Sequence, residues 1–89
     1  MTITDNENLN RLEVIVDGGQ GILRYQIQRE TIWLLHVQVP QEAQGHGVAS
    51  SLTRAALELA KERGLKVVPV CSFIATYVRC HPEYSTLVR

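Results

Sequence analysis

Three stretches of alternating apolar and polar residues follow a polar start. Residues 1–9 show no periodicity and are expected to form a disordered tail. Apolar residues then recur at every second position in residues 12–16, 23–27 and 31–39. The sequence Asp-Gly-Gly-Gln at 17–20 favours a tight turn, and Arg29-Glu30 makes a short polar break. The pattern predicts three strands in an antiparallel meander.

The third of these stretches is the most apolar, and strict alternation divides it between two faces. One face is predicted to carry Trp33, Leu35, Val37 and Val39, and the other Ile32, Leu34, His36 and Gln38. The second face is therefore expected to become polar toward the end of the strand.

After Pro40 the apolar period becomes helical. Apolar residues at 48, 52, 55, 56 and 59 predict an amphipathic helix that ends at Gly64. Residues 65–70 follow as a buried strand, which a right-handed crossover places parallel to the third strand, and Pro69 puts it at a sheet edge. A last helix is expected from Ser72 to about Arg79. The prediction is one α+β domain over residues 10–89 with the order βββαβα.

Composition limits the classes of function. The chain has 89 residues, of which 45% are hydrophobic, and this suffices for one small core. The formal net charge is zero, so a strongly basic nucleic-acid-binding protein is not expected. Residues 1–43 carry a net charge of −3 and residues 44–89 a net charge of +3. The second half is thus the expected location of any site for an anionic small molecule.

Targeting and redox features point to the cytoplasm. No apolar run has the length of a membrane span, and the acidic start differs from a secretory signal. Cys71 and Cys80 are expected to be free thiols. The cysteines and histidines lack the spacing of a metal site, so no metal is predicted.

The segment with the clearest chemistry is Gln44-Gly45-His46-Gly47-Val48-Ala49, at the start of the predicted long helix. Two glycines there leave backbone N–H groups accessible, and the helix dipole adds to their attraction for a pyrophosphate. A tight strand-to-helix turn with no ligand is the alternative interpretation of the two glycines.

The spacing Gln44-x-x-Gly47-x-Ala49 resembles the (Arg/Gln)-x-x-Gly-x-(Gly/Ala) signature of the Gcn5-related N-acetyltransferase (GNAT) superfamily. It follows a strand ending in Val-x-Val-Pro, as in that superfamily. Val70-Cys71-Ser72-Phe73, Tyr77 and His81-Pro82-Glu83-Tyr84 resemble a compact, single-domain GNAT-like branch. The resemblance covers about residues 12–88.

The resemblance implies that acetyl-CoA or coenzyme A binds. The backbone of Val37, Gln38 and Val39 would pair with the pantetheine arm. The pyrophosphate would be wrapped by the loop and the first helical turn, namely Gln44, Gly45, His46, Gly47, Val48, Ala49 and Ser50. The implied partners are an acyl-CoA donor and an unidentified amine acceptor, with no nucleic acid and no membrane, and the chain is expected to be a monomer or a weak homodimer.

Three residues are candidates for catalysis. Cys71 precedes a helix N-terminus, which favours a thiolate, and is either a nucleophile or a small buried residue. His36 is either a general base, for Cys71 or for an amine acceptor, or a strand histidine bonded to a backbone carbonyl. The resemblance implies that Tyr77 protonates a departing thiolate, and the alternative is a packing role.

Two functions follow as hypotheses. The first is an acetyl-CoA-dependent N-acetyltransferase, with transfer either direct or through a Cys71 acyl-enzyme. The second is a CoA-binding module without turnover. The chain lacks the helices between the first strands and the later strands of larger GNAT enzymes, so the acceptor cannot be carried over.

Overall fold

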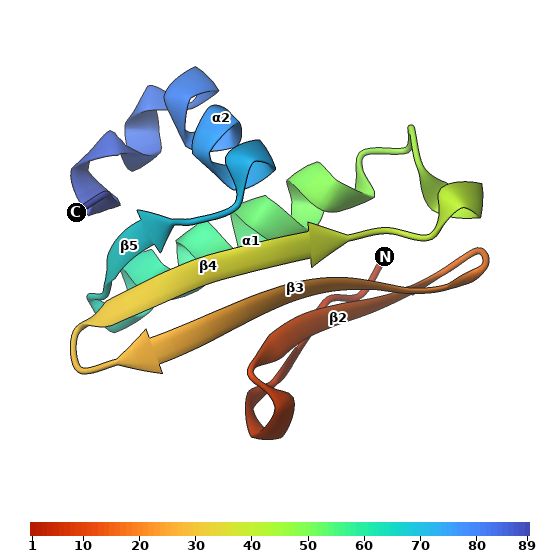
Figure 1. Cartoon of the computed structure of the whole chain (residues 1–89), viewed down its shortest axis with the longest axis horizontal. Helices are drawn as coiled ribbons and strands as arrows, with labels where there is room; N and C mark the ends of the chain where they lie inside the picture. The colour runs from red at the N-terminus through yellow and green to blue at the C-terminus, as the bar shows by residue number, and fades with distance from the viewer.

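The computed structural model describes all 89 residues and contains one five-stranded sheet (Figure 1). Neighbouring strands follow chain order. The first four are antiparallel, and the fifth is parallel to the fourth. The strands are β1 (Thr4–Asn6), β2 (Arg11–Val16), β3 (Gly19–Gln28), β4 (Thr31–Gln38) and β5 (Lys66–Pro69).

Two helices, α1 (Val48–Arg63) and α2 (Ser72–Cys80), pack on one face of the sheet. Three short 3-10 turns complete the chain: η1 (Glu7–Leu9), η2 (Gln41–Ala43) and η3 (Pro82–Leu87). Neither helix combines the length and the apolar character needed to cross a membrane. The predicted α+β fold with a parallel crossover strand is confirmed, and one further strand precedes it.

Local sequence rules account for the C-terminal end of α1 and for the position of β5. Gly64 follows α1 with a φ of 68°, and its N–H bonds to carbonyls of the last turn, as expected for a helix-terminating glycine. β5 is the last strand in the sheet order, as Pro69 predicted. Helix α2 runs one residue beyond the predicted Arg79.

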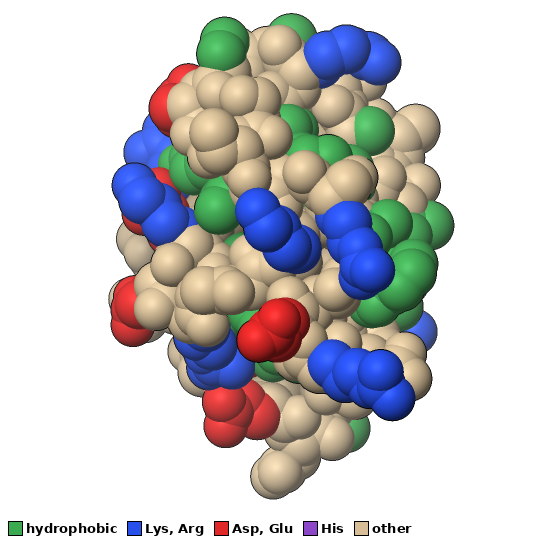
Figure 2. All heavy atoms as spheres, turned by 90° about the vertical axis from the view of Figure 1, so that its left-hand side faces the viewer, with side chains coloured by type: hydrophobic (Ala, Val, Ile, Leu, Met, Phe, Trp, Pro, Cys, Tyr) green, Lys and Arg blue, Asp and Glu red, His purple; other side chains and the backbone are tan.

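The C-terminal residues close one end of the molecule beside β5. The Arg89 N–H donates to Val67 O at 2.9 Å, and Arg89 Nη1 donates to Thr31 Oγ1 at 2.7 Å. Lys66 Nζ donates to Thr86 O at 3.2 Å. Figure 2 faces this end and shows Lys and Arg side chains spread across it, with fewer Asp and Glu.

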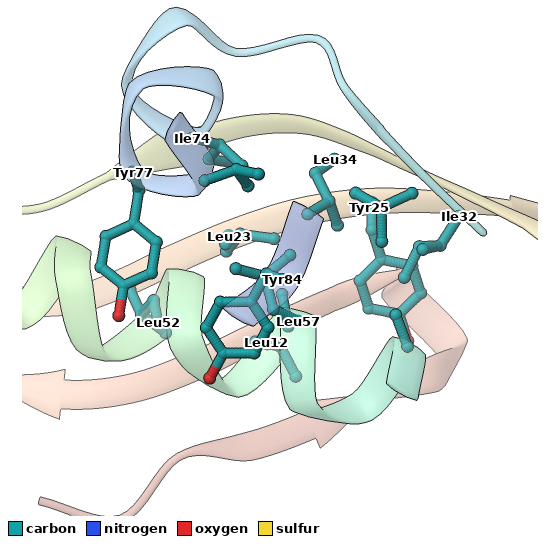
Figure 3. Close-up of a cluster of buried hydrophobic side chains, with 14 of the residues drawn as sticks. Leu12, Leu23, Tyr25, Ile32, Leu34, Leu52, Leu57, Ile74, Tyr77 and Tyr84 are labelled. Carbon is teal, nitrogen blue, oxygen red and sulfur yellow. The ribbon is translucent and has the colours of Figure 1, made fainter. Parts of the chain in front are cut away.

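One hydrophobic core of 18 buried residues lies between the sheet and the helices. Alternate residues of β2, of β3 and of β4 as far as Leu34 enter it. β5 contributes Val67, and α1 contributes one face (Figure 3). Its largest fully buried apolar side chains are Leu23, Ile32, Leu34, Leu52, Leu57, Ile74 and Val67. Burial of each leucine or isoleucine stabilises the fold by roughly 1.5–3 kcal/mol.

A β-bulge in β4 changes which residues face this core. Tyr25 pairs with Leu34 and Arg24 pairs with His36, so Leu35 is an extra residue with no partner. Val37, paired with the buried Leu23, therefore returns to the core side. The predicted division of this strand into two faces is wrong, because strict alternation holds only as far as Leu34.

The prediction of a disordered tail is also wrong for residues 4–9. β1 pairs with β2, and Asp5 Oδ1 accepts a hydrogen bond from the buried Tyr25 hydroxyl at 2.5 Å. Arg63 Nη2 donates to Asp5 Oδ2 at 3.2 Å and to Glu7 Oε1 at 3.0 Å. The segment is polar because it forms a short edge strand, and its order comes from partners about 20 and 58 residues away.

Replacing Asp5 by alanine tests this attachment. We expect Asp5→Ala to lower the free energy of unfolding by about 1–3 kcal/mol, because it leaves the buried Tyr25 hydroxyl without an acceptor. The control Glu7→Ala removes only an exposed partner of Arg63 and should cost about 0.5 kcal/mol or less. Urea denaturation measures both values, and equal effects would contradict the attachment.

Candidate functional site

The loop between η2 and α1 is shaped by two glycines in left-handed conformations. Gly45 has a φ of 84° and Gly47 has a φ of 76°. A side chain at either position would be strained, although a Cβ there would meet only open space. The loop is held to the end of β4 by Gln44, whose Nε2 donates to Val39 O at 3.2 Å.

This conformation leaves a continuous run of backbone donors without acceptors. The N–H groups of residues 45–50 make no hydrogen bond within the chain, and the first helical bond of this region is from Ser51 N to Gly47 O at 3.0 Å. The N-terminal end of the 16-residue α1 adds the positive end of its dipole. Such an array can bind an anion through its backbone alone.

The loop and the helix N-terminus border a hollow of about 210 Å³. Phe73 of α2 lines the hollow opposite the loop and is 41% exposed. The other lining residues are Val39, Ala43, Gln44, Gly45, Gly47, Val48, Ala49 and Ser50. The hollow therefore combines apolar walls with backbone donors, as small-molecule sites do.

Gly21 of β3 fixes the height of α1 above the sheet. A Cβ on Gly21 would lie 3.0 Å from Val48 Cγ1 and 3.3 Å from Leu52 Cδ1. Only glycine leaves enough room for the first turns of α1 to pack this closely. The position of the N-terminal end of α1 thus depends on a residue in the middle of the sheet.

Next to this hollow, β4 has an open edge. β5 pairs with β4 only as far as Leu34, and Leu34 O then accepts from both Val70 N (3.0 Å) and Cys71 N (3.2 Å). Beyond this point β4 continues to Gln38 with a strand on one side only. Backbone groups on the free side of β4 can pair with an extended ligand.

No lysine or arginine lines the hollow. The predicted excess of cations in the second half of the chain lies elsewhere: Lys61 and Arg63 are in the last turn of α1, and Lys66 and Arg89 are at the end shown in Figure 2. His46 faces a separate depression that also includes Asp17. Attraction of an anion to the hollow therefore depends on backbone dipoles.

Cys71 is half-buried at the junction of β5 and α2. Its carbonyl accepts from Ala75 N at 2.9 Å, which makes it the N-cap residue of α2. The N–H groups of Ser72 and Phe73 have no acceptor in the chain. The thiol thus lies at a helix N-terminus, as the sequence predicted.

The other two catalytic candidates form no hydrogen bond with the Cys71 side chain. His36 is exposed on the sheet face that no helix covers, and the only histidine ring in a side-chain hydrogen bond is that of His81. Tyr77 is buried, stacks on the His81 ring at 3.8 Å, and extends from α2 toward α1 (Figure 3). There the nearby Tyr77 hydroxyl raises the pKa of the Arg54 guanidinium.

A second tyrosine holds the C-terminal segment against α1. The Tyr84 hydroxyl donates to Glu58 Oε2 at 2.7 Å, and this carboxylate raises the pKa of Tyr84 to about 12. Tyr77 and Tyr84 together fasten α2 and η3 to α1. These contacts support the packing interpretation of both side chains.

Seven of the ten predicted cofactor-binding residues line the hollow. Val37 and Gln38 belong to the adjoining open edge of β4, and His46 points away. Sequence reasoning missed Ala43 and the supporting Gly21. It considered the backbone N–H groups of Ser72 and Phe73 as donors to an oxyanion, but not the Phe73 side chain as a wall of the hollow. The turn that buries Ala43 and the packing of α2 against α1 depend on tertiary contacts, which periodicity does not reveal.

Comparison with known proteins identifies the class. A family model described as GCN5-related N-acetyltransferase matches residues 11–87. The chain belongs to this family, as its resemblance in residues 44–49 predicted.

Among curated proteins, the chain is 33% identical over 64 residues to protein NATD1 of Xenopus tropicalis, covering 71% of this chain and 59% of the relative. It is also 33% identical over 64 residues to protein NATD1 of Homo sapiens, covering 71% and 57% respectively. The chain thus spans less than two thirds of the length of these relatives.

A solved structure agrees over a longer range. The solution structure of a GCN5-like protein from Staphylococcus aureus superposes with a TM-score of 0.77 at 25% sequence identity. The match covers 99% of this chain and 87% of the other. The whole fold, β1 included, therefore has a counterpart in a GCN5-like structure.

The free donors at residues 45–50 predict that the loop responds to a simple anion. We expect pyrophosphate to shift the amide resonances of these residues in a heteronuclear NMR titration, because each N–H gains an acceptor. Amides near the start of β5 serve as the internal control for ionic strength. A uniform response across the chain would contradict a localised site.

Proposed function

We propose that this chain binds coenzyme A thioesters at the loop of residues 44–50 and transfers the acetyl group of acetyl-CoA to an amine. The observation that carries the proposal is the run of unpaired N–H groups at residues 45–50, bordering a hollow beside the open edge of β4. Family membership supports the same reaction class.

Each part of the site suits one part of such a ligand. The backbone donors of residues 45–50 suit a pyrophosphate, whose charge the α1 dipole also favours. The free side of β4 at Val37 and Gln38 suits the amides of an extended pantetheine arm, which can bond like an added strand. The apolar wall formed by Val39 and Phe73 suits its alkyl portion.

The transfer itself exchanges two bonds at the acetyl carbon. The amine nitrogen forms a C–N bond, the C–S bond breaks, and the proton lost by the amine ends on the departing thiolate. Negative charge develops on the carbonyl oxygen during this exchange. The N–H groups of Ser72 and Phe73, which lack acceptors, are the proposed donors to that oxygen.

Cys71 offers a second route for the same reaction. Its thiolate would take the acetyl group first, releasing CoA as a thiol, and an amine would then displace the cysteine sulfur. The helix N-terminus beside Cys71 favours the required thiolate. His36 is the base that the sequence suggested for this route, and Tyr77 is the candidate acid for direct transfer.

A CoA-binding module without turnover is the second candidate function. Its supporting observation is that no hydrogen bond joins the side chains of Cys71, His36 and Tyr77. In this function the chain would retain the loop and its ligand but need a partner to complete the acceptor side. Action in the cytoplasm as a monomer or weak homodimer stays a prediction.

Substitution of Gly47 tests ligand binding. Gly47→Val places a branched side chain in the space beside the free N–H groups, so we expect CoA affinity to fall by about tenfold or more, or about 1.4 kcal/mol. Gly64→Val is the matched control, because Gly64 has a similar φ of 68° and equally open surroundings at the other end of α1. Calorimetric titration with CoA should show the loss in the first variant only. If the wild type shows no measurable binding at millimolar CoA, the proposal is contradicted.

Substitution of Cys71 distinguishes the two routes. If the acetyl group passes through the thiol, intact mass after incubation with acetyl-CoA will show one added acetyl group that Cys71→Ala lacks and the control Cys80→Ala keeps. Cys71→Ala should then abolish turnover while CoA affinity stays within a few-fold. Wild-type turnover by Cys71→Ala would exclude the relay and leave direct transfer, with Tyr77→Phe as the next variant.

A further inference from the structure

The uncovered face of the sheet carries a row of basic side chains across three strands. Arg11 of β2 pairs with Arg24 of β3, and Arg24 pairs with His36 of β4. The buried neighbours Leu12 and Leu23 face the core, so the three basic side chains share the opposite, open face. The bulge at Leu35 completes the row, because it rotates His36 out of the core side.

The pairing of basic side chains across these strands destabilises the sheet. Like charges directly opposite one another on neighbouring strands repel. Glu13 neutralises Arg11, accepting a hydrogen bond from its Nε, and this contact lowers the pKa of the Glu13 carboxyl. Arg24 has no ion pair or side-chain hydrogen bond, and it is exposed. The exposed Arg24 guanidinium, which has no partner in the chain, therefore favours an anionic ligand.

A hollow of about 350 Å³ lies beside this row. The polar side chains that line it include Arg11, Arg24 and Gln26, and Leu9 and Leu35 add apolar surface. A guanidinium next to apolar side chains suits a carboxylate on a short carbon chain, because the fork of N–H groups matches the two carboxylate oxygens.

The hollow and the proposed place of acetyl transfer are connected through neighbouring residues of β4. Leu35, which lines it, directly follows Leu34, whose carbonyl accepts from Cys71 N at 3.2 Å. From Leu35 onward no strand covers the free side of β4. A ligand anchored on the open face can thus extend around this edge toward the thiol and the start of α2.

We propose that this hollow is an acceptor subsite, in which the unpaired Arg24 binds the carboxylate of an amine-bearing substrate. The substrate class is an amino acid or a similar ω-amino carboxylate, whose amine reaches the thioester around the edge of β4. This inference rests on the proposed acetyl transfer. Beyond the proposed function, the inference specifies the face of the sheet from which the acceptor enters and the negative charge that the acceptor carries.

Matched acceptors test the subsite. The probes are β-alanine, 5-aminopentanoate and 7-aminoheptanoate, each compared with the alkylamine of equal chain length, with CoA release measured from acetyl-CoA. We expect the best carboxylate to exceed its alkylamine by about tenfold in kcat/KM, and Arg24→Gln to bring that ratio close to one. Arg79→Gln, an exposed arginine on α2 outside this hollow, should keep the wild-type ratio. A ratio near one in the wild type, or an unchanged ratio in Arg24→Gln, would overturn the subsite.

A binding measurement separates this proposal from the proposed function. Hexanoate is titrated into the protein, and we expect it to shift the amide resonances of residues 24 and 35 in the wild type but not in Arg24→Gln. Calorimetry with CoA is run on the same samples. Intact CoA binding without a hexanoate response at tens of millimolar overturns the subsite alone, whereas loss of CoA binding in the wild type overturns the proposed function.

Discussion

The separation of β5 from β4 at Leu34 is the constraint on which the arrangement of this molecule depends. Leu34 O is the last acceptor that β4 offers to this neighbour, and it binds two successive N–H groups, those of Val70 and Cys71. The chain then turns into α2, while β4 continues with one side free. A single backbone junction thus creates an open strand edge and places a thiol and a helix N-terminus beside it.

The bulge at Leu35 lies next to this junction and has a second consequence. It returns Val37 to the core, so the end of β4 remains packed although β5 no longer covers it. It also turns His36 to the open face, opposite Arg24. Without the extra residue, the imidazole would enter the core side and Val37 would be exposed. The bulge therefore reconciles a stable strand end with an unpaired edge.

The parts of the fold set by local rules could be predicted from the sequence. Gly64 ended the long helix, Pro69 marked an edge strand, and the glycines at 45 and 47 marked the loop, because each rule concerns the conformation of one residue. The family resemblance came from the same loop. β1, by contrast, was missed, since its polar residues are ordered by Tyr25 and Arg63, which are distant in the chain.

The bulge was missed for a related reason. Period-two alternation assumes an unbroken register, and nothing in residues 31–39 marks the position at which one residue is left unpaired. His36 was assigned as a partner of Cys71 because its strand neighbours the strand that ends at Cys71. The register that turns His36 to the open face also aligns it with Arg24 and Arg11, which lie in different strands and show no common sequence pattern.

The two helix N-termini meet at one hollow because side chains farther along the helices hold them together. Phe73, in the first turn of α2, lines the same space as Val48 and Ala49 in the first turn of α1. One turn beyond Phe73, Tyr77 reaches α1 near Arg54, and Tyr84 bonds to Glu58. These contacts set the distance between the helices without occupying the hollow. Because the hollow lacks cationic side chains, its affinity for an anion depends on how both sets of backbone N–H groups are oriented. The tyrosines thus contribute to the hollow through the geometry of the two helices.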